Sequence, residues 1–381
     1  MFDFEFHNPT RVIFGRGKES VIGAELRQGG ASKVLLVYGS GSTKRTGLLD
    51  RVLGYLSENS IQAVQFGGVV SNPVLSHARR GVEIAKNEKV DAVLAVGGGS
   101  VLDEGKAIAV GALASDDIWG YYTGKVPEAA LPIYAILTLA ATGSEMNGTS
   151  VMTNEETKQK YPMKSSAIYP TVSILNPELT YTVPPDYSAY AAVDAVAHVI
   201  EGYFTKDGGP VLQDRFVESI IKAVMETSRI FMEEPDNYDA RAEFMWAATL
   251  ALNGLTLTGV KGFSFPNHMI EHSLSAIYNI AHGAGLSIVI PAWMKWYSRS
   301  HPRQFERFSQ EIFGVSGVGA GIEALESWYR GLHAPVRLGD ADIPAADIDM
   351  IAANAHDTGV RWGIGDEYPV SAIAEILSLA T

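Results

Sequence analysis

The sequence predicts an α/β domain with a parallel sheet in residues 1–184 and an all-α domain in residues 185–381. The length of 381 residues suits two domains, because most domains contain roughly 100–200 residues. In the first half, short β-rich runs alternate with helical patterns, as in parallel sheets. After Pro184 and Pro185, long amphipathic patterns replace this alternation.

The elements of the first half follow one another at short intervals. Strands are predicted at 34–37, 64–66, 92–96, 132–137 and 172–175, and helices at 47–57 and 77–87. In the second half, the longest helices are predicted at 187–204, 214–232, 240–256 and 282–297. The tail beyond residue 316 has helical periodicity and contains no recognisable motif.

Composition narrows the classes of function. The chain is 46% hydrophobic and 19% charged, which is typical of a globular protein with a large core. A net charge of −13 argues against nucleic acids and anionic membranes as partners. The absence of cysteine excludes disulfides, cysteine nucleophiles and thiolate zinc sites. Without a signal-peptide pattern or a long apolar run, we expect a cytoplasmic protein.

Four residues have the chemistry of a metal site. Asp194 and His198 are four residues apart and share one helix face, while His268 and His282 follow later in the chain. One carboxylate and three imidazoles suit Fe²⁺ or Zn²⁺ and leave room for a substrate oxygen. A histidine by itself is more often a core or surface residue, and the chain contains nine. His272, one turn after His268, is either a fourth imidazole at the metal or a proton carrier.

A glycine-rich turn, Gly97-Gly98-Gly99-Ser100, follows a predicted strand and opens a predicted helix. Glycines let the main chain approach a phosphate, and a helix N-terminus offers free N–H groups to it. The turn departs from the G-x-G-x-x-G fingerprint of dinucleotide-binding folds. The alternative is an ordinary strand-to-helix turn in which Ser100 is the N-cap.

Two further loops follow predicted strands. The first, 39–45, begins with Gly39 where NAD-binding folds place an acid, and its hydroxyls and two cations suit a 2′-phosphate. The second, 141–147, is polar and contains a glycine, as expected of a loop at the ligand-binding edge of a parallel sheet. The alternatives are a solvated loop for the first and a simple turn for the second.

The order of these motifs resembles the iron-containing alcohol dehydrogenase family, and within it the butanol dehydrogenase type of NADPH-dependent aldehyde reductases. The similarity runs from Asn8 to at least Trp293. The motifs that carry it are 97–103, 138–145, Asp194 with His198, 238–241, 245–248, and His268 with His272 and His282.

The resemblance implies a metal bound by Asp194, His198, His268 and His282. It also implies dinucleotide contacts, which add to those expected of the glycine-rich turns. The combined candidates are Gly39, Ser40, Ser42, Asn72, Gly97, Gly98, Gly99, Ser100, Thr138, Thr142 and Lys160. Glycine at position 39 indicates a preference for NADP(H) over NAD(H). The candidate catalytic residues are His272 and Asp103.

We therefore expect a metal-dependent, NADP(H)-linked alcohol dehydrogenase or aldehyde reductase that acts on small primary alcohols and aldehydes as a homodimer. One alternative is a metal- and NAD-using lyase similar to dehydroquinate synthase. That reaction needs a Lys and Arg cluster for a phosphate, and the stretch from Asp194 to His282 shows no such array. The other alternative is a non-catalytic protein that binds a metal or a nucleotide.

Overall fold

The computed structural model describes residues 1–381, which form two compact units. The α/β unit comprises His7–Val183 and Pro235–Met245, and the helical unit comprises Met1–Phe6, Pro184–Glu234 and Trp246–Thr381. This division differs in two short segments from the predicted one at residues 184 and 185. A shift in sequence pattern cannot reveal a chain that crosses between units and returns, as helix α9 (Tyr238–Ala251) does.

The α/β unit is built on a parallel sheet, as predicted, and the sheet has six strands. Its strands, in the order in which they pair, are β1 (Arg11–Phe14), β8 (Val172–Leu175), β5 (Ile133–Leu139), β4 (Ala92–Gly98), β2 (Lys33–Gly39) and β3 (Gln62–Val69). The central strands are almost continuously apolar and buried, as expected of a sheet covered on both faces. Strand β1, at one edge, was not predicted.

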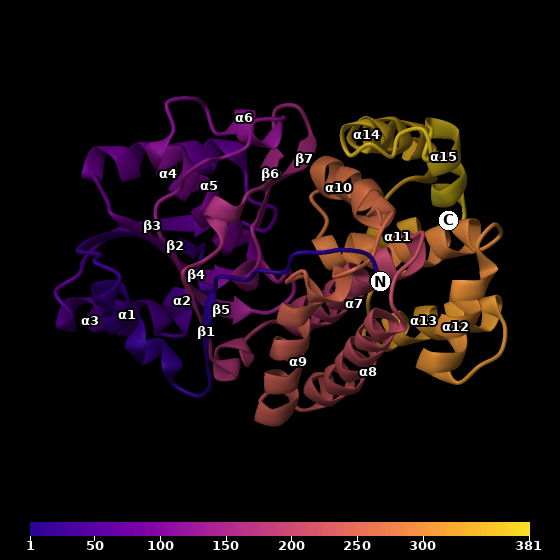
Figure 1. Cartoon of the computed structure of the whole chain (residues 1–381), viewed down its shortest axis with the longest axis horizontal. Coiled ribbons are helices and arrows are strands. Elements are labelled where there is room, and N and C mark those ends of the chain that lie inside the picture. Colours follow the sequence, from indigo (N-terminus) through magenta and orange to yellow (C-terminus); the bar gives the residue numbers. More distant parts are fainter. The chain divides into compact units, whose positions relative to one another are not determined.

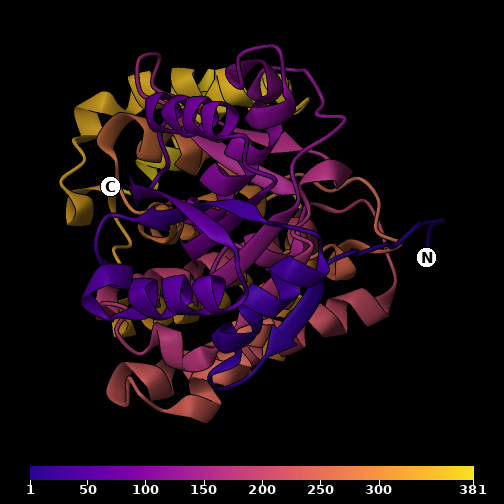
Figure 2. The same cartoon turned by 90° about the vertical axis from the view of Figure 1, so that its left-hand side faces the viewer.

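Helices lie on both faces of this sheet (Figures 1 and 2). The helices of the unit are α1 (Ile22–Gln28), α2 (Ser42–Arg45), α3 (Leu48–Glu58), α4 (Leu75–Glu88), α5 (Gly99–Leu113) and α6 (Trp119–Tyr122). Helix α1 packs on α3, and α4 packs on α5. Short 3₁₀ turns occur at Lys18–Val21, Ser144–Met146, Ser166–Ile168 and Pro177–Thr180.

The strand order reverses between β2 and β4, because β3 pairs with the outer side of β2 and the later strands continue beyond β4. In parallel sheets, ligands bind beyond the carboxyl ends of the strands at such a switch point. Tyr38 pairs with Val96, so the turns that begin at Gly39 and Gly97 lie side by side. The sheet therefore brings both predicted glycine-rich turns to the place expected of a ligand site.

An antiparallel hairpin, β6 (Thr149–Asn154) and β7 (Gln159–Lys164), was not predicted. Its strands are polar and lack the apolar alternation that marks a half-buried strand in a sequence. The hairpin matters for the site because it carries Lys160, which lies opposite Thr153 in the ladder.

The helical unit contains no strand, as predicted for the second half of the chain. In addition to the shared α9, its helices are α7 (Pro185–Thr205), α8 (Val211–Glu233), α10 (Pro266–Tyr278), α11 (His282–Tyr297), α12 (Pro302–Phe313), α13 (Val318–Gly331), α14 (Ile348–Arg361) and α15 (Val370–Ser378). Short 3₁₀ turns occur at Leu255–Leu257, Leu338–Ala341 and Ala345–Asp347. Helix α11 packs against both α7 and α10, and α10 packs against α14. None of the helices is long and apolar enough to span a bilayer.

Candidate functional site

The four predicted metal ligands converge in the helical unit. Asp194 and His198 lie on α7, His268 lies on α10, and His282 is the first residue of α11. Oδ1 of Asp194 is 3.5 Å from Nε2 of His198, 3.8 Å from that of His268 and 3.6 Å from that of His282. Three imidazole nitrogens from three helices therefore lie within 3.8 Å of one oxygen of Asp194, and the donor atoms of Asp194, His268 and His282 all lie within 4.8 Å of one another.

The spacing of these atoms fits a divalent ion. Ligand bonds of about 2.0–2.2 Å at tetrahedral angles place neighbouring donor atoms roughly 3.3–3.6 Å apart, close to the three distances from Oδ1 of Asp194. Nε2 of His268 is buried and has no hydrogen-bond partner in the protein. Such a nitrogen is costly to bury unless a further group binds it. Nitrogen and carboxylate donors suit both Fe²⁺ and Zn²⁺.

Two buried carboxylates fix the orientation of two ligand imidazoles. Glu201 accepts a hydrogen bond of 2.9 Å from Nδ1 of His268, and Glu271 accepts one from Nδ1 of His282. Each contact turns Nε2 toward Asp194 and keeps the proton on Nδ1. Both glutamates are fully buried. Carboxylate–histidine pairs of this kind hold imidazoles in position at metal sites in proteins.

Neither glutamate was predicted, although the sequence contains a signal for each. Glu201 is seven residues after Asp194 and three after His198, so all three lie on one stripe of α7. Glu271 follows His268 by three residues on α10. The stripe identifies residues on a common face, but only the packed helices show which imidazole each carboxylate contacts.

His272 lies beside this group of ligands. Its ring centre is 5.7 Å from that of His282, and donor atoms of Glu271, His272 and His282 lie within 4.8 Å of one another. The ring meets Trp362 edge to face at 5.4 Å. Trp362 directly follows α14, so the tail in which no motif was recognised borders the site. The catalytic role of His272 remains a prediction.

The first turn of α5 has the features of a phosphate-binding site. Gly98 is its N-cap, and no side chain caps the helix, so Ser100 is not the N-cap. A Cβ atom at Gly97 would lie 2.5 Å from Val101, and one at Gly99 would lie 2.4 Å from Oγ1 of Thr142. These positions therefore require glycine, and the uncapped N–H groups can bind an anion.

The neighbouring turn after β2 differs, because its glycine is not required for packing. A Cβ atom at Gly39 would meet nothing closer than 3.7 Å, so the main chain there leaves room for a Cβ atom. Ser40 and Ser42 are exposed, and Ser42 opens α2. The ammonium of Lys44 lies 5.4 Å from the ring centre of Tyr38. The turn thus offers hydroxyls and a cation beside an open position.

Two other predicted dinucleotide contacts, Asn72 and Lys160, are 88 residues apart and meet in the structure. Nζ of Lys160 donates a 3.0 Å hydrogen bond to Oδ1 of Asn72, and both residues are buried. Asn72 has a left-handed backbone (φ 54°), which asparagine tolerates better than most residues. Thr138 lies in the last part of β5, and Thr142 contacts the start of α5.

Asp103 is held on both carboxylate oxygens. Oδ1 accepts a hydrogen bond from Ser144 Oγ at 2.6 Å, and Oδ2 accepts one from the N–H of Val151 at 3.0 Å. Burial raises the pKa of Asp103, while nearby Lys106 and these hydrogen bonds act in the opposite direction. Both oxygens are occupied by structural contacts, and a catalytic role for Asp103 remains a prediction.

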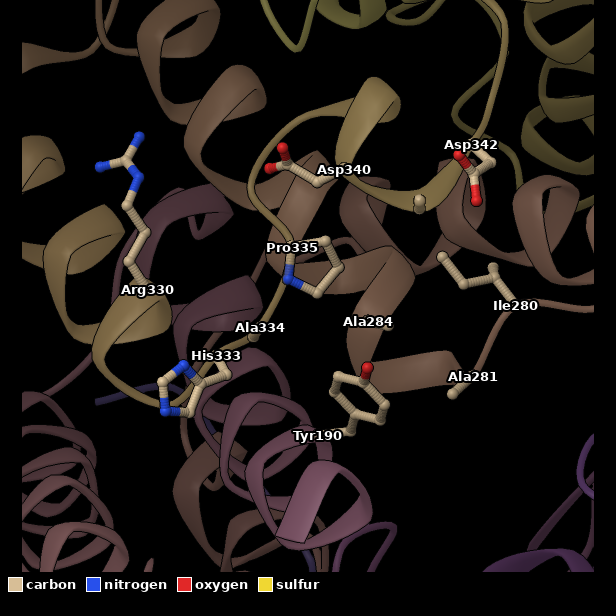
Figure 3. A pocket seen from close by; sticks show the side chains of 11 residues that line it. Tyr190, Ile280, Ala281, Ala284, Arg330, His333, Ala334, Pro335, Asp340 and Asp342 are labelled. Carbon is tan, nitrogen blue, oxygen red and sulfur yellow. The ribbon is translucent and has the colours of Figure 1, made fainter.

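A separate cavity of about 520 Å³ lies in the helical unit (Figure 3). Tyr190, Arg330, His333, Asp340 and Asp342 supply its polar lining, and none of the four predicted ligands lines it. Arg330 is already bonded to Glu326, and Asp340 accepts hydrogen bonds from two main-chain N–H groups. Its mixed charges therefore do not select a ligand of one sign.

Comparison with known proteins identifies the family of the chain. Residues 9–177 match the model of the iron-containing alcohol dehydrogenase family, and residues 188–378 match the C-terminal model of the same family. A probable NADH-dependent butanol dehydrogenase 1 of Bacillus subtilis is 41% identical over 94% of this chain and 95% of its own length. The NADPH-dependent aldehyde reductase YqhD of Escherichia coli is 34% identical over 97% of both chains.

A solved structure gives the same result. The NADH-dependent butanol dehydrogenase A of Thermotoga maritima superposes with a TM-score of 0.97 at 46% identity, covering 100% of this chain and 99% of the other. The similarity therefore includes both units and the order of their elements.

Proposed function

Because the chain belongs to the iron-containing alcohol dehydrogenase family, we propose that it interconverts small, butanol-like primary alcohols and their aldehydes, using NADP(H) and one divalent ion, Fe²⁺ or Zn²⁺. The observation that carries the proposal is the convergence of one Asp194 oxygen and three imidazole Nε2 atoms. Family membership favours an oxidoreductase over a lyase or a non-catalytic protein.

Each part of the site has a distinct task in this proposal. The four ligands hold the ion, with Glu201 and Glu271 orienting His268 and His282. When bound, the ion supplies Lewis-acid polarisation of a carbonyl and the reduced nicotinamide supplies a hydride. The uncapped start of α5 holds the pyrophosphate. An imidazole nitrogen of His272 supplies the proton that completes the alcohol.

The proposed preference for NADP(H) rests on Gly39. A carboxylate there would hydrogen-bond the 2′-hydroxyl of NAD(H) and repel the 2′-phosphate of NADP(H). This chain has no side chain at that position, and Lys44 and Arg45 follow in the same turn. The relatives include a probable NADH-dependent and an NADPH-dependent enzyme, so the choice of cofactor is tested directly.

The test of activity uses protein stripped of metal and reloaded separately with Fe²⁺ or Zn²⁺. Reduction of a series of straight-chain aldehydes is then followed by the loss of NADPH or NADH absorbance. We expect turnover with at least one reloaded ion and almost none with the stripped protein. Failure of every aldehyde, cofactor and ion combination would refute the proposed function.

The test of cofactor choice compares wild type with Gly39→Asp. The open space at Gly39 admits the new side chain, so the fold should be retained. We expect the ratio of kcat/KM for NADPH to that for NADH to exceed one in wild type and to fall below one in the variant. Equal kcat/KM values for both cofactors in wild type would contradict the inference from Gly39.

We also propose that the protein is a homodimer, which light scattering of the purified protein would test. A mass of one chain, 41.0 kDa, across a range of protein concentrations would refute this.

A further inference from the structure

A lysine with no exposed surface, Lys106, lies at the centre of a polar network in the α/β unit. It projects from α5, and its ammonium donates hydrogen bonds to Oγ of Ser144 at 2.8 Å, the carbonyl of Asn147 at 2.9 Å and the carbonyl of Thr149 at 2.8 Å. Ser144 and Asn147 lie in the loop between β5 and β6, and Thr149 is the first residue of β6. We propose that Lys106 is a positioning residue that sets the affinity for the dinucleotide by fixing this loop against α5.

Two hydrogen-bonded routes lead from Lys106 to Thr142. In one, Ser144 accepts from Lys106 while its N–H donates to Oγ1 of Thr142 at 3.2 Å. In the other, Asn147 accepts from Lys106 while its side-chain amide donates to the carbonyl of Thr142 at 3.2 Å. Thr142 in turn packs on Gly99, the first residue of α5. Lys106 thus holds the residue that borders the proposed phosphate site.

Asp103 contacts both the same loop and the start of β6. Its carboxylate accepts from Ser144 and from the N–H of Val151, and its carbonyl accepts from Ser150 at 2.8 Å. Ser144 therefore accepts from Lys106 and donates to Asp103, which links the two charged residues of α5. The geometry gives Asp103 the same positioning role as Lys106.

Two more carbonyls of the loop accept hydrogen bonds from side chains. Ser173 donates to the carbonyl of Glu145 at 2.6 Å, and Asn8 donates to that of Met146 at 2.8 Å. Every carbonyl from Glu145 to Asn147 thus has a side-chain donor, and the three donors come from distant parts of the chain. A buried cation is a costly way to stabilise a loop, because well-packed apolar residues often stabilise as much. Its advantage is a single defined loop conformation, which a ligand site needs.

The charge of Lys106 links this loop to pH. Burial lowers the pKa of Lys106 to about 8, and Asp103 and Glu145 partly oppose that effect. Asp103 lies on the same helix and Glu145 on the loop, while Lys160 of the hairpin acts on Asp103. Tyr122 of α6 is linked to Asp103 through Ser150, with which it forms a hydrogen bond. Loss of the proton above about pH 8 removes a donor from the loop, so dinucleotide affinity should weaken there.

The proposal rests on the proposed function, and it is tested with Lys106→Met and Ser144→Ala in the full chain. Dissociation constants for NADPH are measured by nicotinamide fluorescence without substrate, together with metal content and thermal unfolding. We expect Kd to rise roughly tenfold in Lys106→Met, about the effect of one hydrogen bond to a charged group, and less in Ser144→Ala. KM for NADPH should rise more than kcat falls, and metal content should not change.

The control is Asp91→Asn, which weakens a hydrogen-bonded turn directly before β4. This turn lies at the amino ends of the strands, away from the glycine-rich turns at their carboxyl ends. Asp91 accepts from the N–H of Ser32 at 2.9 Å and from its hydroxyl at 2.7 Å. This variant should unfold at a lower temperature and keep the wild-type Kd. In wild type, Kd should rise above about pH 8, and Lys106→Met should lack that rise.

The outcomes separate this proposal from the proposed function. If wild type binds neither NADPH nor NADH, the proposed function fails. If wild type binds and both variants keep its Kd while losing stability as Asp91→Asn does, only the positioning role is refuted. Should Lys106→Met fail to fold, Ser144→Ala decides, because it replaces a small buried side chain with one of similar size. A wild-type Kd in that variant then refutes the role.

Discussion

The proposed metal ligands in the helical unit and the glycine-rich turns in the α/β unit are built on opposite principles. The first site consists of side chains, and its ligand atoms are held by other side chains such as Glu201 and Glu271. The second consists of main-chain N–H groups, and side chains are excluded from it at Gly97 and Gly99. Substitutions at the first site should therefore remove a side-chain group that binds the ion. Substitutions at the second site should instead change the conformation of the glycine-rich turns.

The largest effect is expected at the ligands themselves. His268→Ala or His282→Ala removes one of four donors, so metal occupancy should fall, and turnover should fall by several orders of magnitude as Lewis-acid stabilisation worth several kcal/mol is lost. Elemental analysis of the purified variants measures metal occupancy, and steady-state kinetics measures turnover. His301→Ala, at an exposed histidine that stacks on Tyr297, is the control and should keep its metal. Tight, full metal occupancy in both ligand variants would exclude them as ligands.

The variant His272→Ala distinguishes between two roles of His272, that of a metal ligand and that of a proton carrier. As a carrier, His272 can be lost without loss of metal, while kcat falls by about 10²–10⁴ and one limb of the pH–rate profile disappears. If it only packs against Trp362, activity should survive and stability should fall by about 1–3 kcal/mol. Near-wild-type kcat across the pH range with metal bound would contradict the carrier role, and loss of metal equal to that of His268→Ala would make it a ligand.

A smaller effect on the same site is expected from Glu201→Gln. The amide keeps the size of the side chain but loses the charge that fixes His268, so metal affinity should fall by about 10–100-fold. Competition with a chelator measures this without turnover. The control is Glu218→Gln, at a buried carboxylate of the same unit that pairs with Arg307. That variant should lose stability and keep wild-type metal affinity, whereas an equal loss of affinity in both would contradict the assigned role of Glu201.

In the α/β unit, the largest effects are expected from substitutions that add atoms to the glycine-rich turn. Gly99→Ala places a methyl group 2.4 Å from Oγ1 of Thr142, so the turn must shift, and KM for NADPH should rise by roughly tenfold while metal content stays constant. The control is Gly54→Ala, because a Cβ atom there meets nothing within 4 Å on the exposed side of α3. That variant should gain about 0.5–1 kcal/mol of stability and bind NADPH normally. Unchanged KM in Gly99→Ala would show that this turn does not hold the dinucleotide.

Some elements of the fold could be predicted from the sequence alone and others could not. The buried strands β2, β4, β5 and β8 are apolar runs bounded by turn residues, and they were predicted within a few residues. The β6–β7 hairpin was missed because its pairing partners, and not its own pattern, make it a sheet. The exchange of segments between the units was missed for a similar reason, since tertiary packing alone decides it.

At the candidate site, spacing alone identified Asp194 with His198, since one helix turn carries both. His268 and His282 were candidates for the same ion from their chemistry, and the family resemblance strengthened that prediction, because three separate helices carry the four residues. Trp362 and the network around Lys106 have no local signal at all. Their contacts join residues about 40 to 90 positions apart, and only the folded chain creates them.

Glu201 links the proposed metal site to the local stability of the start of α10. The same carboxylate that fixes the imidazole of His268 also accepts hydrogen bonds from the main-chain N–H groups of Asn267 and His268, at the first turn of α10. The start of that helix and the ligand therefore share one anchor. By thermodynamic linkage, ion binding should raise the free energy of local opening there, and chelation should speed hydrogen exchange at the first-turn amides of α10 before the rest of the unit loosens.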